Sequence, residues 1–128
     1  MSDSFPDRSC VLIADDNALN AEVTAALLEH AGYSVDIASN GQEAVTMAES
    51  KEYCALILDC QMPVLDGYEA AHKIRSLNKT NTDVPIIALS GLDNHTNAER
   101  FNASGMNDHL TKPVALRELK AVLDKWLS

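Results

Sequence analysis

The chain has 128 residues, 46% of them hydrophobic, and this length is typical of one compact domain. Its net charge of −9, from 19 acidic and 10 basic residues, disfavours contact with nucleic-acid phosphates. No apolar run approaches the ~20 residues of a membrane-spanning helix and no signal-peptide pattern is present, so we expect a cytoplasmic domain that neither binds nucleic acid directly nor inserts into a membrane.

Two apolar runs are the first clear elements of the chain. Residues 1–9 are polar and form a loose lead-in to a single domain expected over 10–128. The runs 10–14 and 54–58 are short and apolar enough to be strands buried on both faces. We expect the second of them to be the central strand of a sheet.

The remaining elements alternate between helix and strand. In chain order we expect a helix over 17–30, a strand over 34–38, a helix after the Asn40-Gly41 turn, a helix opened by Asp66-Gly67, a polar loop over 78–83, a strand over 85–89, a helix over 96–103, a strand over 109–111 and a last helix. The expected packing stripes, in helix order, are Leu19, Val23, Ala26, Leu27 and His30; Ala44, Val45 and Ala48; Ala70, Ala71, Ile74 and Leu77; Ala98 and Phe101; and Leu116, Leu119, Leu123 and Trp126.

Five strand-helix units with short connections imply a parallel sheet with helices on both faces. In such sheets, ligands bind beyond the carboxyl ends of the strands. The residues that follow strands one, three, four and five there are Asp15 with Asp16, Asp59, Ser90 and Lys112. The topology therefore predicts one site that contains all five side chains.

These side chains suit metal-assisted phosphoryl chemistry. Two carboxylates about 4 Å apart repel by roughly 4 kcal/mol at an effective dielectric near 20, so a cluster of three must hold protons or bind a cation. Mg²⁺ prefers oxygen ligands and leaves room for a phosphoryl group. A carboxylate beside the metal can become an aspartyl phosphate, while the Lys112 ammonium neutralises phosphoryl oxygens and the Ser90 hydroxyl donates a hydrogen bond to one of them.

The three cysteines, Cys10, Cys54 and Cys60, are odd in number and have no CxxC spacing. Each lies in or beside an apolar run. We therefore expect buried, reduced thiols rather than a redox pair.

From about Val11 to Trp126 the chain resembles the receiver domain of two-component response regulators. The motifs that carry the resemblance are Asp15-Asp16-Asn17, the stretch from Asp59 to Gly67, Ala88-Leu89-Ser90 and Lys112-Pro113, in the family's order and at its approximate spacing. The resemblance implies an α/β, flavodoxin-like, doubly wound fold with a five-stranded parallel sheet of order 2-1-3-4-5 and helices on both faces.

The resemblance also assigns roles to the site. Asp59 is the expected phosphoacceptor, Asp16 a direct Mg²⁺ (or Mn²⁺) ligand, Asp15 a ligand through water, and the Gln61 backbone carbonyl a further ligand. Lys112 matches the phosphoryl-binding lysine, and its bond to Pro113 is expected to be cis.

The switch region departs from the commonest family pattern. Ser90 matches the switch hydroxyl, but His109 stands where many receivers have Tyr or Phe, and Gly91 replaces a frequent alanine. We include His109 in the switch and expect it to be partly buried and structural rather than pH-responsive.

Two further motifs resemble receivers of hybrid histidine kinases or phosphorelays more than those fused to DNA-binding domains. They are Asn17 with Asn20, and Gln61-Met62-Pro63. Members of the family often dimerise through the fourth strand, fourth helix and fifth strand. The resemblance therefore implies a dimer of this kind, which we expect to depend on phosphorylation.

The leading functional hypothesis is a signalling domain. We expect it to catalyse only its own phosphorylation and dephosphorylation, and not to act as an enzyme on other substrates. A histidine kinase or histidine phosphotransfer protein would supply the phosphoryl group, and a downstream protein would read the changed surface. A Mg²⁺-dependent aspartyl-phosphate phosphatase is disfavoured because Gln61 stands where a second carboxylate would protonate a leaving group. An interaction module that is never phosphorylated is disfavoured because the acceptor, acidic pair, hydroxyl and lysine are all present.

Overall fold

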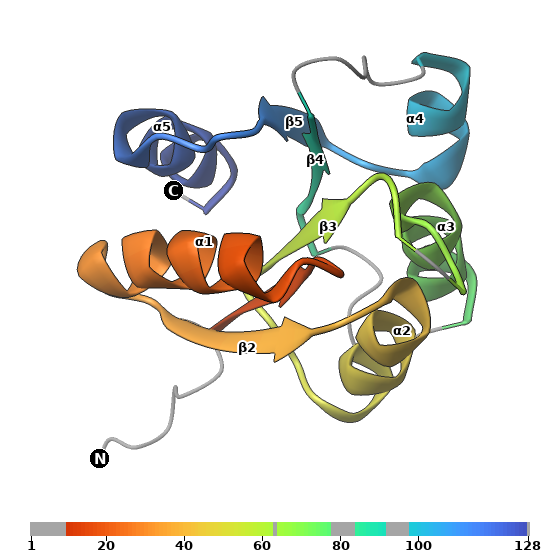
Figure 1. The fold of residues 1–128 in the computed structure, drawn as a ribbon. Coiled ribbons are helices and arrows are strands. Elements are labelled where there is room, and N and C mark those ends of the chain that lie inside the picture. Colours follow the sequence, from red (N-terminus) through yellow and green to blue (C-terminus); the bar gives the residue numbers. More distant parts are fainter. Residues whose placement is uncertain (1–9, 63, 78–83, 92–97, 128) are drawn as a thin grey trace.

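The computed structural model describes residues 10–62, 64–77, 84–91 and 98–127, in which strands and helices alternate (Figure 1). Across these ranges no helix combines the length and apolar character needed to span a bilayer. The elements are β1 (Cys10–Ala14), α1 (Ala18–His30), β2 (Ser34–Ala38), α2 (Gly41–Ser50), β3 (Ala55–Asp59), α3 (Gly67–Leu77), β4 (Ile86–Ser90), α4 (Ala98–Ser104), β5 (Asp108–Thr111) and α5 (Leu116–Leu127).

The sheet is parallel throughout and has the order β2-β1-β3-β4-β5, which confirms the predicted topology. Every residue of β1, β3 and β4 is buried, as continuous apolar runs predict for strands covered on both faces. The register pairs Ala14 with Leu58 and Asp59 with Leu89. The residues that end β1, β3 and β4 therefore meet at one edge of the sheet.

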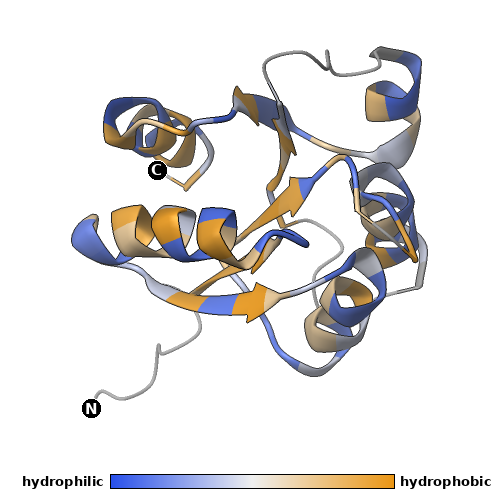
Figure 2. Ribbon diagram, viewed as in Figure 1, coloured by the Kyte–Doolittle hydropathy of each residue, from blue (hydrophilic) through white to orange (hydrophobic). Residues whose placement is uncertain are grey.

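Alternate residues of the strands build two separate cores, one on each face of the sheet (Figure 2). On one face, Leu12, Leu56 and Ile86 pack with α2, α3 and α4. On the other face, Ile13 and Ile57 pack with α1 and α5. This two-sided packing fixes the strand ends, and with them the loops that carry polar residues.

The predicted packing stripes of α2, α3 and α5 are confirmed at their centres. Buried members are Ala44, Val45 and Ala48 in α2, Ala70, Ala71 and Ile74 in α3, and Leu119 and Leu123 in α5. Phe101 of α4 is partly buried against the core, as expected. Leu77 and Ala98 lie in these stripes too, but their side chains are outside the described part of the structure.

The stripe predicted for α1 is wrong except at Leu27, which is partly buried against the core. Its buried residues are Ala21, Thr24, Ala25 and Leu28, whereas Leu19 is 69% and Val23 52% exposed. Apolar residues, alanines and larger aliphatic ones together, occur around the whole circumference of α1, so their spacing does not single out one face. Small residues let the helix pack closely on the sheet, and its larger aliphatic residues are left at the surface.

Boundaries near the C-terminal half differ slightly from the expected ones. The fourth strand lies over Ile86–Ser90 rather than 85–89, β5 begins one residue early at Asp108, and α4 is described from Ala98. The expected lead-in 1–9, the loop 78–83 and the first residues of the predicted fourth helix lie outside the described residues. The predicted cis peptide between Lys112 and Pro113 is present.

Side-chain bonds hold the connection around β5. Arg75 of α3 donates from Nε and Nη2 to the Gly105 carbonyl, at 3.1 and 2.9 Å, and from Nη2 to Asn107 Oδ1 at 2.8 Å. The same Asn107 oxygen accepts the Ile86 N–H at 2.8 Å. Trp126 of α5 donates from Nε1 to Asp108 Oδ2 at 3.0 Å. These bonds fix β5, and so fix the start of the segment that carries Lys112.

Val64 has a backbone φ of 70°, in the left-handed region, although it is β-branched. This conformation costs roughly 1–2 kcal/mol in an L-residue, whereas asparagine adopts it readily. Because Val64 is 79% exposed, Val64→Asn loses little packing. We expect the free energy of unfolding to rise by about 1 kcal/mol in urea titrations.

Val23→Asn is the matched control, because Val23 is also exposed but lies within a regular helix. Its effect should stay within about 0.5 kcal/mol, since valine and asparagine have similar helix propensities. A Val64→Asn protein no more stable than the wild type would contradict the strain at this position.

The cysteines have the unreactive character expected of them. Cys10 and Cys60 are buried, Cys54 is half-buried, and none forms a disulfide. Burial, with the neighbouring Cys10, raises the pKa of Cys54 to about 11. Burial also raises the pKa of Cys60. The thiolate, which is the reactive form, is therefore scarce near neutral pH.

At pH 8 a thiol with this pKa is about one part in a thousand thiolate, against about a quarter for an ordinary cysteine. Alkylation of Cys54 by iodoacetamide should therefore be roughly two hundredfold slower in the native protein than in urea, and should speed up as the pH rises toward 11. Mass spectrometry of the cysteine peptides measures both rates. Equal native and unfolded rates would contradict this account.

Candidate functional site

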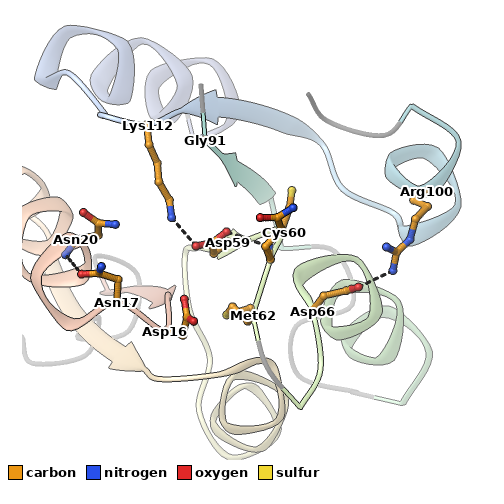
Figure 3. Close-up of a pocket in the computed structure, with 11 residues that line it drawn as sticks. Asp16, Asn17, Asn20, Asp59, Cys60, Met62, Asp66, Gly91, Arg100 and Lys112 are labelled. Atoms are coloured by element: carbon orange, nitrogen blue, oxygen red, sulfur yellow. Dashed lines mark hydrogen bonds and ion pairs between the residues drawn. The ribbon is translucent and has the colours of Figure 1, made fainter. Parts of the chain in front are cut away.

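An open pocket of about 740 Å³ lies at the carboxyl-terminal ends of the strands (Figure 3). It brings together residues from the β1–α1 connection and the first turn of α1, the end of β3 and the β3–α3 connection, the residue after β4, α4, and the residue after β5. The lining residues are Asp16, Asn17, Asn20, Asp59, Cys60, Gln61, Met62, Asp66, Gly91, Arg100 and Lys112.

Three carboxylates form the acidic centre of this site, as predicted. One oxygen from each of Asp15, Asp16 and Asp59 lies within 4.8 Å of the others. Asp15 and Asp59 are only 2% and 4% exposed, whereas Asp16 is exposed. Asp15 Oδ2 is fully buried and has no hydrogen-bond partner. Carboxylates so close together in a protein interior repel one another, and a cation would relieve this repulsion.

The two buried carboxylates are held in the same way. Asp15 Oδ1 accepts the Asn17 N–H at 2.9 Å, and Asp59 Oδ1 accepts the Gln61 N–H at 3.0 Å. Each is a local turn in which an aspartate side chain bonds the backbone two residues on. The second oxygen of each carboxylate is thereby directed to the Lys112 ammonium, at 3.4 Å from Asp15 and 2.5 Å from Asp59.

Burial and charge have opposite effects on the pKa values of Asp59 and Lys112. Burial raises the pKa of Asp59, against the lowering effect of the hydrogen bond from Lys112. Burial alone would lower the pKa of Lys112, but its bond to Asp59 and the charges of Asp59 and Asp15 raise that pKa above the ordinary lysine value. Lys112 therefore stays an ammonium, which balances one of the three carboxylates.

Close backbone packing lets α3 begin directly beside the acceptor candidate. A Cβ atom on Gly67 would lie 2.3 Å from the Asp59 carbonyl oxygen, so only glycine fits there. Asp66 caps α3, because its Oδ1 accepts the Glu69 N–H at 2.9 Å. This confirms the helix-entry interpretation of Asp66-Gly67.

The two residues predicted for the switch, Ser90 and His109, differ in burial. Ser90 is buried at the end of β4, and its carbonyl accepts the Lys112 N–H at 2.7 Å. His109 is exposed, so the expectation of partial burial is wrong. Because β5 is an edge strand, its outward residues lack cover on one side. The ring of His109 meets Phe101 of α4 edge-to-face, with centroids 6.4 Å apart and an interplanar angle of 89°.

Sequence reasoning missed Arg100 altogether. Its Nη2 lies 2.7 Å from Asp66 Oδ2, and its guanidinium is 4.5 Å from the centre of the Tyr68 ring. This arginine comes from the short helix α4, so its place at the pocket depends on how α4 packs beside α3. No motif in the chain indicates that contact.

Comparison with known proteins gives consistent results. Residues 11–124 match the family model of the response regulator receiver domain. The chain is 35% identical over 120 residues to the hybrid signal transduction protein dokA of Dictyostelium discoideum, and 40% identical over 126 residues to two-component system protein A of Emericella nidulans. These alignments cover 94% and 96% of the chain, but only 7% and 18% of the two relatives.

Solved structures extend the comparison to three dimensions. The receiver domain of the sensor histidine kinase PA1611 from Pseudomonas aeruginosa, which has a magnesium ion coordinated in its active site cleft, superposes with a TM-score of 0.85 at 39% identity, over 93% of this chain and 97% of that one. The receiver domain of Ssk1 from Saccharomyces cerevisiae was crystallised with the histidine phosphotransfer protein Ypd1. It superposes with a TM-score of 0.81 at 35% identity, over 91% of this chain and 87% of that one. The chain therefore belongs to the response regulator receiver domain family.

Proposed function

We propose that this domain accepts a phosphoryl group from a phosphohistidine onto Asp59, in a reaction that requires a divalent cation, and signals through the resulting change in its surface. One observation carries the proposal. Asp59 lies in a cluster of three carboxylates within 4.8 Å of one another, and the Lys112 ammonium is 2.5 Å from its Oδ2. The acceptor, a cation site and a neutralising group thus share one pocket.

The donor atoms suit Mg²⁺ or Mn²⁺. Asp15, Asp16, Asp59 and the backbone carbonyl of Gln61 would supply oxygen ligands only, which hard cations prefer. The buried Asp15 Oδ2 pairs with the Lys112 ammonium at 3.4 Å but forms no hydrogen bond, which fits a ligand or a partner of a metal-bound water. When bound, the cation neutralises charge on the transferred phosphoryl group. The magnesium ion in the PA1611 receiver supports this assignment.

The chain's own groups account for the transfer itself. The Asp59 carboxylate attacks phosphorus, the bond from phosphorus to the donor breaks, and the phosphoryl oxygens pair with Lys112. The turn from Asp59 to the Gln61 N–H holds the carboxylate in place during the reaction. We infer a phosphoacceptor that catalyses only its own phosphorylation and dephosphorylation, because Gln61 offers no second carboxylate to act on other phosphoesters.

We infer that the donor is a histidine kinase or a histidine phosphotransfer protein. We also infer that the domain works in the cytoplasm, where such a donor would meet it. The Ssk1 receiver was crystallised with such a phosphotransfer protein, Ypd1. In this chain, α1 presents Leu19 and Val23 to the surface, while Asn17 and Asn20 beside them line the pocket. Apolar colouring runs along much of α1 (Figure 2). A protein that covers this side of α1 can reach Asp59.

For the output we propose the surface formed by β4, α4 and β5. Ser90 at the end of β4 and His109 on β5 are the switch candidates, and the contact of His109 with Phe101 links β5 to α4. A change in the Ser90 position on phosphorylation would be read there by a downstream protein, or by a second copy in a phosphorylation-dependent dimer.

Acetyl phosphate with Mg²⁺ should add the mass of one phosphoryl group to the wild type, and none to Asp59→Asn. Removing the cation with EDTA should slow labelling at least about tenfold, since the repelling carboxylates then face the incoming phosphate unscreened. Intact-protein mass spectrometry measures both. Asp124→Asn, at an exposed position of α5, is the control and should be labelled at the same rate as the wild type. Labelling that survives Asp59→Asn would remove the assignment.

Mg²⁺ should also stabilise the folded protein. At a concentration one hundred times its dissociation constant it adds about 2.7 kcal/mol to the free energy of unfolding. Asp15→Asn should lose most of this gain, and without Mg²⁺ should be no less stable than the wild type, because one of three repelling carboxylates is gone. Urea unfolding with and without Mg²⁺ measures the difference. An equal gain in Asp15→Asn would show that the cation binds elsewhere.

A further inference from the structure

Asn20 has a side-chain amide that the fold itself does not use. It lies in the first turn of α1, is half-buried, and lines the pocket that contains Asp59 and Lys112. Its backbone N–H donates to Asn17 Oδ1 at 3.0 Å. Within the described ranges, its side-chain amide makes no hydrogen bond. Because this amide bonds no other group among the described residues and lines an open pocket, it is available to contact a ligand there.

The neighbouring asparagine has a structural explanation that Asn20 lacks. Asn17 is the N-cap of α1, and its Oδ1 accepts the Asn20 N–H. Asn20 lies inside the helix, where asparagine is less favourable than alanine or leucine by up to about 0.7 kcal/mol. Capping therefore accounts for Asn17 and leaves the amide of Asn20 unexplained.

The position of Asn20 suits a contact with the donor rather than with the acceptor. Asp59 is at the buried floor of the pocket, with 4% exposure, so a donor must approach it from the open side. Figure 3 shows Asn20 and Asn17 on the α1 wall, opposite Asp66 and Arg100, with Asp59 and Lys112 between the two walls. In an in-line transfer, the leaving group is on the side of phosphorus away from the attacking carboxylate. The leaving group therefore lies toward the mouth of the pocket, where α1 begins.

We propose that Asn20 is a positioning residue for the phosphoryl donor: its amide oxygen accepts a hydrogen bond from the imidazole N–H of the phosphohistidine. This inference rests on the proposed function, in which the donor is a phosphohistidine. The side-chain amide can turn its oxygen toward the donor, because O and N of an asparagine exchange by rotation about one bond. The exposed Leu19 and Val23 on the same helix place a bound donor protein directly beside it.

The hydrogen bond has a chemical consequence. The proton lies on the ring nitrogen that does not carry phosphorus, so the donor ring is positively charged before transfer. The Asp59 carboxylate forms a bond to phosphorus, the phosphorus–nitrogen bond breaks, and its electron pair stays on nitrogen. Imidazole then leaves as a neutral molecule that keeps its proton. By accepting from that N–H, Asn20 holds the ring in line and favours its protonated form.

A pair of small donors tests this role in the intact chain. Phosphoimidazole carries the leaving group that Asn20 is inferred to contact, whereas acetyl phosphate has no ring N–H. The initial rate of phosphorylation of Asp59 is measured with each donor at saturating Mg²⁺, for the wild type, Asn20→Ala, Asn20→Asp and the control Asn102→Ala. Asn102 is exposed on α4 and is not a lining residue of the pocket.

For Asn20→Ala we expect the phosphoimidazole rate to fall about tenfold or more, as for the loss of one hydrogen bond to a charged group, while the acetyl phosphate rate stays within about twofold. Asn20→Asp keeps an acceptor oxygen in the same place, so its ratio of the two rates should return to within about threefold of the wild type. Asn102→Ala should leave both rates unchanged. Alanine favours the helix, so the Asn20→Ala protein should fold.

The other outcomes overturn the inference. Equal losses with both donors would mean that Asn20 acts on the metal or the phosphoryl group, and no loss with either would mean that it has no role. A wild type that takes phosphate from acetyl phosphate but not from phosphoimidazole would contradict the Asn20 role and leave Asp59 as the acceptor. A wild type that is labelled by neither donor would contradict the proposed function itself.

Discussion

The repulsion among Asp15, Asp16 and Asp59 is the constraint on which the rest of the site depends. Burial deprives two of these carboxylates of water, and the backbone turns at Asn17 and Gln61 prevent them from moving apart. Only one cation of the protein, Lys112, contacts the pair among the described residues. The folded protein therefore keeps an excess of negative charge that Lys112 does not fully balance, and a divalent cation can neutralise this excess before a phosphoryl group approaches.

The sheet supplies the rigidity that such a cluster requires. β1, β3 and β4 are buried on every residue, and their ends are fixed by parallel pairing and by separate cores on the two faces. Lys112 reaches the cluster from β5, an edge strand held through Arg75, Asn107 and Trp126. Asp15 and Asp59 thus lie at the ends of strands buried on both faces, whereas Lys112 follows an edge strand. This difference agrees with an acceptor that stays in place while β5 and α4 respond.

The sequence predicts most of the fold and the acidic centre, because continuous apolar runs identify buried strands and polar residues directly follow them. It fails for α1, where apolar residues on all sides hide the packing face, and there the structure exposes Leu19 and Val23. It also fails for His109, whose exposure follows from the edge position of β5 rather than from its neighbours in the chain. Arg100 could not be predicted, since its contacts with Asp66 and Tyr68 depend on how two helices pack.

Chemical trapping of the phosphorylated residue tests the central claim most directly. Borohydride reduces an acyl phosphate on aspartate to homoserine, and peptide mass spectrometry locates the change in the chain. After phosphorylation by a phosphohistidine donor with Mg²⁺, homoserine at position 59 is the result we predict. Homoserine at position 15 or 16, or phosphorylation that gives no homoserine at all, would contradict Asp59 as the acceptor.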